Sequence, residues 1–168
     1  MGNWLNSDSL YLKFGTDKAT ANKAGENVTV GALREIEVKI DLTALTQSET
    51  VQSDQVFFPI GARIQEVETI AITGAVTGTA IDLGLIRTDR TTEIDYDGLL
   101  AAAPTANMNS AGERSLYQVA VTIPTGLTGT GALVGTTTSN VGYITCSRTD
   151  ATAFTAGLIV VKIRYFVP

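Results

Sequence analysis

The chain has 168 residues, of which 44% are hydrophobic and 17% are charged, and its formal net charge at pH 7 is -5. This length suits one domain with its own hydrophobic core, and the composition is that of a folded protein. The acidic balance, without a block of lysines or arginines, argues against nucleic acid as a partner. The lack of any histidine excludes Ser-His and Cys-His catalytic pairs.

The first 25 residues predict an arm. Residues 9–14 alternate and could form a short strand, but residues 15–25 are small and polar with few apolar anchors. Such a segment becomes ordered only against something else, because alone it cannot offset the entropy of being fixed. The expected division is an N-terminal arm, residues 1–25, and a β-sandwich domain, residues 26–168.

Two segments show the alternation of a strand with one buried face. Residues 34–42 place apolar and charged side chains on opposite faces, and residues 157–167 repeat the pattern. The side chains expected in the core are Ile36, Val38, Ile40 and Leu42 from the first segment, and Ile159, Val161, Ile163 and Tyr165 from the second.

The region between the first strand and residue 78 is less regular. Residues 43–54 are polar and predict a loop or a helical turn, and residues 55–58 predict a short strand ended by Pro59. Along residues 63–73 the two-residue period breaks once, which a β-bulge near Gln65 and Glu66 would explain; a helical interpretation of this part stays open. Residues 74–78 predict a turn or hairpin tip.

Residues 80–103 combine several signals. Residues 80–87 and 91–95 predict a hairpin with a three-residue loop, and Asp97-Gly98 predicts a turn with a left-handed position. Residues 99–103, Leu-Leu-Ala-Ala-Ala, predict a short helix that ends at Pro104.

Strands are also expected at residues 116–123 and 140–147, with a long loop rich in Thr and Gly at residues 124–138. Eight or nine short strands and almost no helix favour an all-β fold. The expected architecture is a single-domain antiparallel β-sandwich, jelly-roll-like, with at most one short helix.

No motif predicts a catalytic, cofactor or metal site. The run from Asp95 to Gly98 resembles the middle of a calcium loop, but that register would place the final glutamate at Pro104. Glu93 and Asp95, with Asp82 across the hairpin, could serve glycoside hydrolysis, although exposed acids on a wet sheet face are far commoner. The Gly-rich segment 126–135 lacks the P-loop lysine and no helix follows it.

Cys146 is the only cysteine in the sequence, so it cannot form an internal disulfide. The apolar residues around it predict a buried thiol in a strand. The N-terminus lacks the pattern of a signal peptide, and no apolar run of about 18 residues predicts a membrane span. No membrane partner is expected.

Several segments resemble a family of small virion structural proteins of tailed bacteriophages, including marine and cyanobacterial phages, that act as capsid decoration (cement) proteins. The matching segments are residues 33–46, 59–64, 82–86, 92–99, 131–136 and 153–157. The resemblance implies a β-sandwich bound to the outside of the major capsid shell in the virion, and synthesis in the host cytoplasm. It implies no catalysis and no cofactor, with the major capsid protein and further copies of the chain, as a homodimer or homotrimer, as partners.

A cement protein needs a segment that becomes ordered on contact, and strand addition by an arm is one way to provide it. The apolar anchors of the arm are the expected contacts with the capsid: Trp4, Leu5, Tyr11, Leu12 and Phe14. A frayed terminus or an ordinary first strand is the alternative for this segment.

Two other functions stay open. One is a carbohydrate- or receptor-binding β-sandwich of a phage fibre, and the other is a glycan-cleaving enzyme that uses Glu93 and Asp95.

Overall fold

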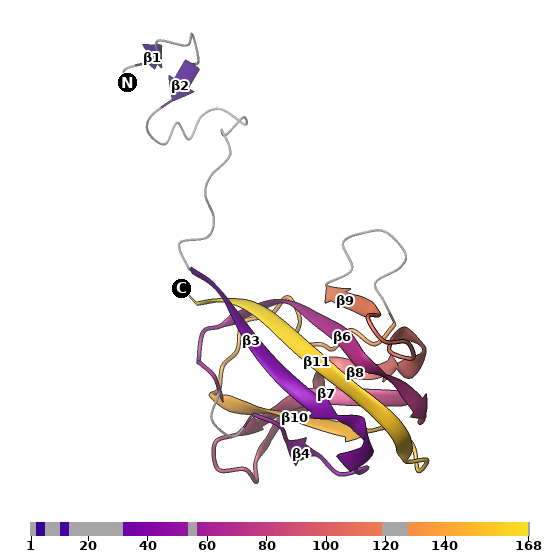
Figure 1. Cartoon of the computed structure of the whole chain (residues 1–168). Coiled ribbons are helices and arrows are strands. Elements are labelled where there is room, and N and C mark those ends of the chain that lie inside the picture. Colours follow the sequence, from indigo (N-terminus) through magenta and orange to yellow (C-terminus); the bar gives the residue numbers. More distant parts are fainter. Residues whose placement is uncertain (1–2, 6–10, 14–31, 54–56, 119–127, 168) are drawn as a thin grey trace. The chain divides into compact units, whose positions relative to one another are not determined.

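The structure, a computed structural model, describes residues 3–5, 11–13, 32–53, 57–118 and 128–167 (Figure 1). The chain divides into two units, Met1–Val30 and Gly31–Pro168. In the first unit, β1 (Asn3–Leu5) and β2 (Tyr11–Lys13) form an antiparallel pair. The boundary expected after residue 25 lies outside the described residues.

The second unit consists of two antiparallel sheets, as Figure 1 shows, which confirms the expected all-β sandwich. One sheet has the order β3-β11-β6-β9, and the other has the order β4-β10-β7-β8, with β5 also paired to β10. The first sheet contains β3 (Ala32–Asp41), β11 (Phe154–Val167), β6 (Arg63–Thr77) and β9 (Arg114–Gln118). The second contains β4 (Thr50–Val51), β5 (Phe57–Phe58), β10 (Gly142–Arg148), β7 (Ala80–Arg87) and β8 (Glu93–Pro104).

The strand β3 follows its sequence pattern. Its even-numbered residues from Ile36 to Ile40 are buried, and its odd-numbered residues are exposed. A short 3-10 helix, η1 (Leu42–Ala44), ends the strand, and the carboxylate of Asp41 caps it by accepting from the N–H of Thr43 at 3.0 Å. The expected alternation of β11 is confirmed as well, since Ile159, Val161 and Ile163 are fully buried.

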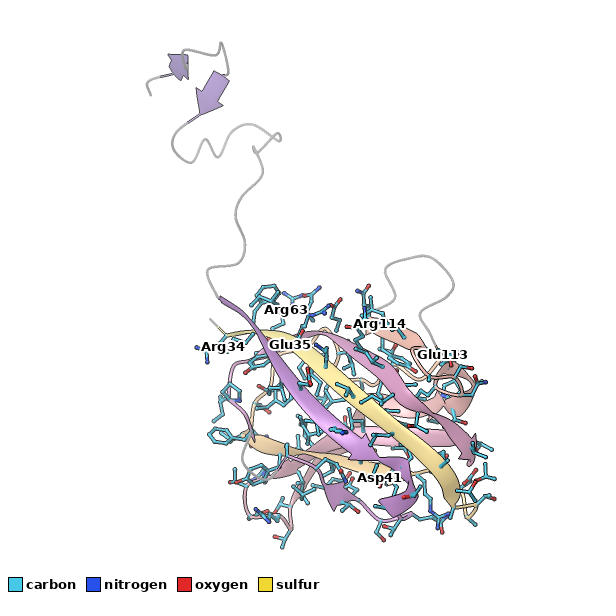
Figure 2. The ribbon with its side chains drawn as sticks, viewed as in Figure 1. Arg34, Glu35, Asp41, Arg63, Glu113 and Arg114 are labelled. Atoms are coloured by element: carbon cyan, nitrogen blue, oxygen red, sulfur yellow. The ribbon has the colours of Figure 1, made fainter. Side chains whose placement is uncertain are left out.

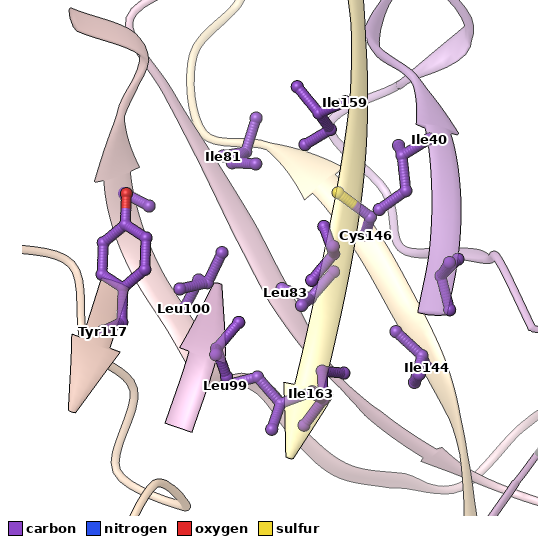
Figure 3. Packing of buried hydrophobic residues seen from close by; sticks show 14 of the residues in the cluster. Ile40, Ile81, Leu83, Leu99, Leu100, Tyr117, Ile144, Cys146, Ile159 and Ile163 are labelled. Atoms are coloured by element: carbon purple, nitrogen blue, oxygen red, sulfur yellow. The ribbon is translucent and has the colours of Figure 1, made fainter. Parts of the chain in front are cut away.

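The core lies between the sheets and draws on both (Figure 3). Ile40, Ile159 and Ile163 from the first sheet pack with Leu83 and Ile144 from the second. Aromatic rings join the layers at one point, because Phe58 and Tyr165 pack in a tilted arrangement with ring centroids 5.0 Å apart. Cys146 is a free, fully buried thiol, as expected, and its burial raises the pKa of that thiol.

A β-bulge explains the broken period of β6. The pairing with β11 shifts between Ile64, opposite Tyr165, and Glu66, opposite Arg164, so Gln65 is the extra residue. Because the bulge restores the phase, both Ile64 and Val67 point into the core, where neither is exposed. The expected bulge is confirmed, and the helical alternative is wrong. The turn expected at residues 74–78 is also wrong for most of its length, because β6 continues to Thr77.

The helix expected at residues 99–103 is wrong, because the segment belongs to β8. Its backbone pairs with β7 on one side and with residues 129–133 on the other. The N–H of Ala101 donates to the carbonyl of Gly129 at 2.9 Å, and Gly131 donates to Leu99 at 3.1 Å. Leu99, Leu100 and Ala103 are fully buried, so tertiary packing outweighs the helical propensity of the Leu and Ala side chains.

The turn expected at Asp97-Gly98 is wrong as well, because Gly98 lies inside β8 and does not have positive φ. Instead, the pairing of β7 with β8 is irregular here. Leu83 and Leu85, two residues apart on β7, pair with Leu100 and Asp95, which are five residues apart on β8. The hairpin itself is confirmed, with a loop longer than expected. Its turn is held by Asp89, whose carboxylate accepts from the backbone N–H groups of Thr91 and Thr92 at 2.9 and 2.8 Å.

Of the three remaining elements, two agree with the sequence at least in part and one was not expected. The expected strand at residues 116–123 is described as β9 up to Gln118, and the rest lies outside the described residues. The strand expected at residues 140–147 is β10. Residues 105–107 form a second 3-10 turn, η2 (Thr105–Asn107), which was not expected.

A truncation inside the core tests the sandwich. Leu83→Ala removes a fully buried side chain and is expected to lower the free energy of unfolding by about 2–5 kcal/mol, measured by urea denaturation. Leu33→Ala makes the same chemical change at a side chain that is 57% exposed, and it should change the value by less than about 0.5 kcal/mol. Equal losses in the two variants would contradict this core.

Candidate functional site

The outer face of the β3-β11-β6-β9 sheet carries a connected set of ion pairs, here called the ion-pair ladder. Arg164 on β11 lies at its centre and contacts carboxylates from the strands on both sides. Figure 2 shows the labelled Glu35 and Arg114 toward opposite edges of this sheet. The pairs are Arg164 with Glu35 (2.9 Å), Glu66 and Glu68 (3.2 Å), Lys162 with Glu35 (3.2 Å) and Glu37 (3.1 Å), and Arg114 with Glu68 (3.5 Å).

The ladder joins all four strands of the sheet. Gln118 extends it on β9 by donating to Glu66 at 2.6 Å. Hydrogen bonds from Arg164 and then Lys162 hold the pKa of Glu35 below its usual value, and the bonds to Glu35 and Glu66 raise the pKa of Arg164. The charges of this face are therefore largely neutralised from within.

The β4-β10-β7-β8 sheet carries an acidic cluster, made up of Glu49, Asp82, Glu93, Asp95 and Asp97. Burial raises the pKa of Glu49, and the charges of Glu93, Asp95 and Asp82 raise it further. Burial also raises the pKa of Asp95, and a hydrogen bond with Asp97 adds to the effect. The structure thus brings together Asp82, Glu93 and Asp95, as the sequence predicts, and adds two acids.

The acidic cluster has one firm anchor in the backbone. The carboxylate of Asp82 accepts from the N–H of Ala102 at 2.7 Å, which ties β7 to the irregular part of β8. Within the described residues, no group of three acidic or cysteine side chains is arranged to hold a metal ion. None of the helices described is long and apolar enough to cross a membrane.

Exposed apolar side chains occur on both sheets. Ile72, Val76 and Leu116 are 46%, 50% and 41% exposed on β6 and β9. On the other sheet, Phe57 packs edge-on against Tyr143 with ring centroids 6.5 Å apart, and the guanidinium of Arg90 lies 5.3 Å from the centre of the Tyr143 ring. These groups are candidate contact points.

The sheet edges differ in how far they are covered. Residues 129–133 pair along β8 and cover that edge, and residues 135–138 pair with residues 61–64 through bonds such as Gly135 N–H to the carbonyl of Ile64 at 2.7 Å. The edge strand β3 pairs only with β11 among the described residues.

The expected contact residues of the arm fall in the first unit. Trp4 and Leu5 lie in β1, Tyr11 and Leu12 lie in β2, and Trp4 is opposite Leu12 while Leu5 is opposite Tyr11. Phe14 lies outside the described residues. The alternation of residues 9–14 signals β2, whereas the three residues of β1 are too few to signal a strand.

Sequence reasoning missed the partners of Arg164. The alternation of β11 places Arg164 on the wet face, but its carboxylates come from strands distant in sequence. Glu49 was missed as well, because it precedes the two-residue strand β4 and carries no pattern of its own.

No protein family model matches the chain, and no curated protein matches it. Solved structures do match. A chain of the cyanophage Pam1 capsid asymmetric unit is 14% identical with a TM-score of 0.52, and the match covers 92% of this chain and 98% of that chain. A chain of the capsid of Ralstonia phage GP4 is 13% identical with a TM-score of 0.55, covering 88% and 92%.

This chain shares its fold with chains of two phage capsids. The expected resemblance to phage capsid proteins is confirmed at the level of the fold. A third match, in the acidic stable capsid structure of Helicobacter pylori bacteriophage KHP30, is 15% identical with a TM-score of 0.47, covers 83% and 91%, and adds no argument.

Replacing the centre of the ion-pair ladder should change how stability depends on pH. The pKa of Glu35 is lowered in the folded state, so its contribution is present above its ordinary pKa of 4.5 and is lost as pH falls through the folded pKa. Thermal unfolding between pH 7 and pH 2 should show a weaker acid loss in Arg164→Gln than in the wild type. Arg114→Gln, which removes one contact of a mostly exposed side chain, is the control and should keep the wild-type slope.

The acidic cluster should act with the opposite sign. The folded pKa of Asp95 is raised, so its ionised form is disfavoured at pH 7 and this cost disappears as pH falls below the ordinary value of 3.8. Asp95→Asn should therefore raise the unfolding temperature at pH 7, and the gain should shrink on acidification. Asp89→Asn should lower it, because hydrogen bonds from Thr92 and Thr91 lower the pKa of Asp89. A destabilised Asp95→Asn at pH 7 would contradict the electrostatics described.

Proposed function

We propose that this chain is a virion structural protein of a bacteriophage that binds the outside of the major capsid shell and stabilises it as a decoration or cement protein. The observation behind the proposal is the extent of the fold match, which covers nearly the whole of this chain and of the chain from the Pam1 capsid. Because the match covers almost all of both chains, it supports a similar structural role in a capsid, although fold alone does not determine function.

The sandwich supplies the rigid body that such a role requires. Its core contains side chains from both sheets, and its ion-pair ladder ties four strands together on the outside. The domain would keep its shape while bound to a shell under internal pressure. Its surfaces and edges would then make the contacts, which is the non-enzymatic role proposed here.

The N-terminal segment is the proposed tether to the shell. The proposed division is residues 1–25 as the arm and residues 26–168 as the sandwich domain. Strand-forming pieces, β1 and β2, carry the proposed contact residues Trp4, Leu5, Tyr11 and Leu12, with Phe14 directly after them. The 18 residues from 14 to 31 could span at most about 65 Å if fully extended, which would let the arm reach shell contacts beyond the footprint of the domain.

Self-association, as a homodimer or homotrimer, is part of the proposal. A decoration protein that presents two or three arms at once binds a repeating shell more tightly than a single arm does, because each later contact is intramolecular.

A carbohydrate- or receptor-binding module of a phage fibre is the second candidate. The observation in its favour is the aromatic group of Phe57 and Tyr143, since Phe57 is 51% exposed and aromatic faces are common sugar platforms. Saturable binding of host glycans that is lost in Phe57→Ala would support this candidate.

Binding to purified, undecorated capsid shells tests the main proposal. The full chain should co-sediment with the shells at a saturating, stoichiometric ratio. A variant with serine at positions 4, 5, 11, 12 and 14 should lose at least about tenfold in affinity, because aromatic anchors dominate most interfaces. The control changes Thr16→Ala and Thr20→Ala in the same segment and should bind as the wild type does.

Three outcomes would count against parts of this proposal. Failure of the full chain to bind shells would contradict decoration. Undiminished binding of the serine variant would contradict the role of the arm alone. A virion image with a few copies at one vertex would contradict a position over the whole shell.

A further inference from the structure

The longest edge strand of the described sandwich is β3, with ten residues. The other edge strands are shorter or covered: β4 and β5 have two residues each, β9 has five, and residues 129–133 pair along β8. Among the described residues, β11 alone makes backbone hydrogen bonds with β3. Within the described part of the chain, its far side therefore presents a row of backbone donors and acceptors that another strand can use.

The strand β3 carries one protection of an open edge, the outward lysine Lys39, but it lacks three others. These are a proline, a bulge that twists the edge away, and a charge that points inward. The pairing of β3 with β11 runs without a shift from Ala32, opposite Val167, to Asp41, opposite Leu158. Between residues 35 and 41 there is no proline or glycine, and the inward side chains Ile36, Val38 and Ile40 are all apolar. The edge is thus long, regular and suited to pairing.

The outward charges of β3 are complementary to those of a second, antiparallel β3. Glu37 bears a negative charge, and Lys39, two residues further on, has no ionic partner among the described residues. In a two-fold pairing centred on Val38, Lys39 of each copy lies opposite Glu37 of the other. Opposite charges at directly facing positions stabilise a strand pair.

The same register is favourable on the inward face. It places Ile36 opposite Ile40 of the second copy and Val38 opposite Val38, which are pairs of β-branched side chains that pack well across strands. Glu35 then lies opposite Asp41 near the strand ends seen in Figure 2, but Lys162 and Arg164 neutralise Glu35. A register slipped by two residues, and so centred on Glu37, would set Glu37 against Glu37, and it is therefore disfavoured.

We propose that β3 pairs with β3 of a second copy, antiparallel and centred on Val38, so that two four-stranded sheets become one continuous sheet across a homodimer. The inference rests on the self-association in the proposed function and names the surface that provides it. It requires no particular shell protein.

Charge exchange across the proposed pair tests the inference. In sedimentation velocity over a concentration series, without shells, the full-length wild type should form dimers. Lys39→Glu converts both facing pairs into Glu–Glu and should raise the dimer dissociation constant at least tenfold. Glu37→Lys should weaken self-association in the same way. An equimolar mixture of the two variants should form heterodimers, because each new charge then faces its opposite.

Two controls separate pairing from general effects. Arg87→Glu makes a similar charge change on β7, in the other sheet, and should leave the dimer intact. Lys39→Glu removes no ionic contact seen within the described part of the chain, so its thermal unfolding should match that of Arg87→Glu. Glu37→Lys loses its contact with Lys162, so circular dichroism must show that it folds before it is mixed.

Other results would overturn the inference. A wild type that stays monomeric up to about millimolar concentration, or a dimer that Lys39→Glu does not weaken, would each contradict it. A dimer lost on removal of residues 1–30, but kept in Lys39→Glu, would identify the N-terminal segment as the occupant instead. Shell binding is measured separately, so a monomer that still decorates shells would overturn only the dimer, and a dimer that ignores shells would overturn only decoration.

Discussion

The fold depends on one strand, β11, which pairs with β3 on one side and with β6 on the other. Its inward residues Ile159, Val161 and Ile163 are fully buried against the second sheet, and its outward Lys162 and Arg164 hold carboxylates from both neighbouring strands. This strand ends the domain in sequence, whereas β3 begins it. The sheet can therefore close only after more than a hundred residues are in place, and such long-range pairing makes folding slow and cooperative.

The second sheet is shaped by backbone segments that approach one another very closely. A Cβ at Gly84 would lie 2.1 Å from the carbonyl oxygen of Asp95, and a Cβ at Gly131 would lie 2.3 Å from the carbonyl carbon of Gly98. Only glycine fits at these two positions, which let β8 fold over β7 and let residues 129–133 lie along β8. The coverage of this edge follows from sterics, and it leaves β3 as the long edge of the sandwich.

Local sequence patterns were sufficient to predict the strands that have one solvent-exposed face. They failed where tertiary packing outweighs the intrinsic conformational propensity of the residues. Alternation predicted β3 and β11, and a single break in it predicted the bulge at Gln65. Residues 99–103 read as a helix because Leu and Ala favour one, but burial and pairing with residues 129–133 make them a strand. The ion-pair ladder and the open edge of β3 depend on which strands become neighbours. No local sequence signal shows which strands become neighbours. The acids Asp82, Glu93 and Asp95, in contrast, belong to one hairpin, and the sequence alone was enough to predict that they lie together.

The two outer faces of the sandwich balance each other when pH changes. On the face with the ion-pair ladder, Glu35 has a lowered pKa. The stability that it contributes is therefore lost as the solution becomes acidic. On the other sheet, burial raises the pKa values of three acids: Glu49, Asp82 and Asp95. The free-energy cost of ionising these acids in the folded state therefore disappears as the pH falls. Since the two slopes have opposite signs, the free energy of unfolding should vary less with acidification than it would if every carboxylate were paired. Glu49, Asp82 and Asp95 therefore take up protons at a higher pH than free carboxyl groups do, and their protonation removes an unfavourable buried charge.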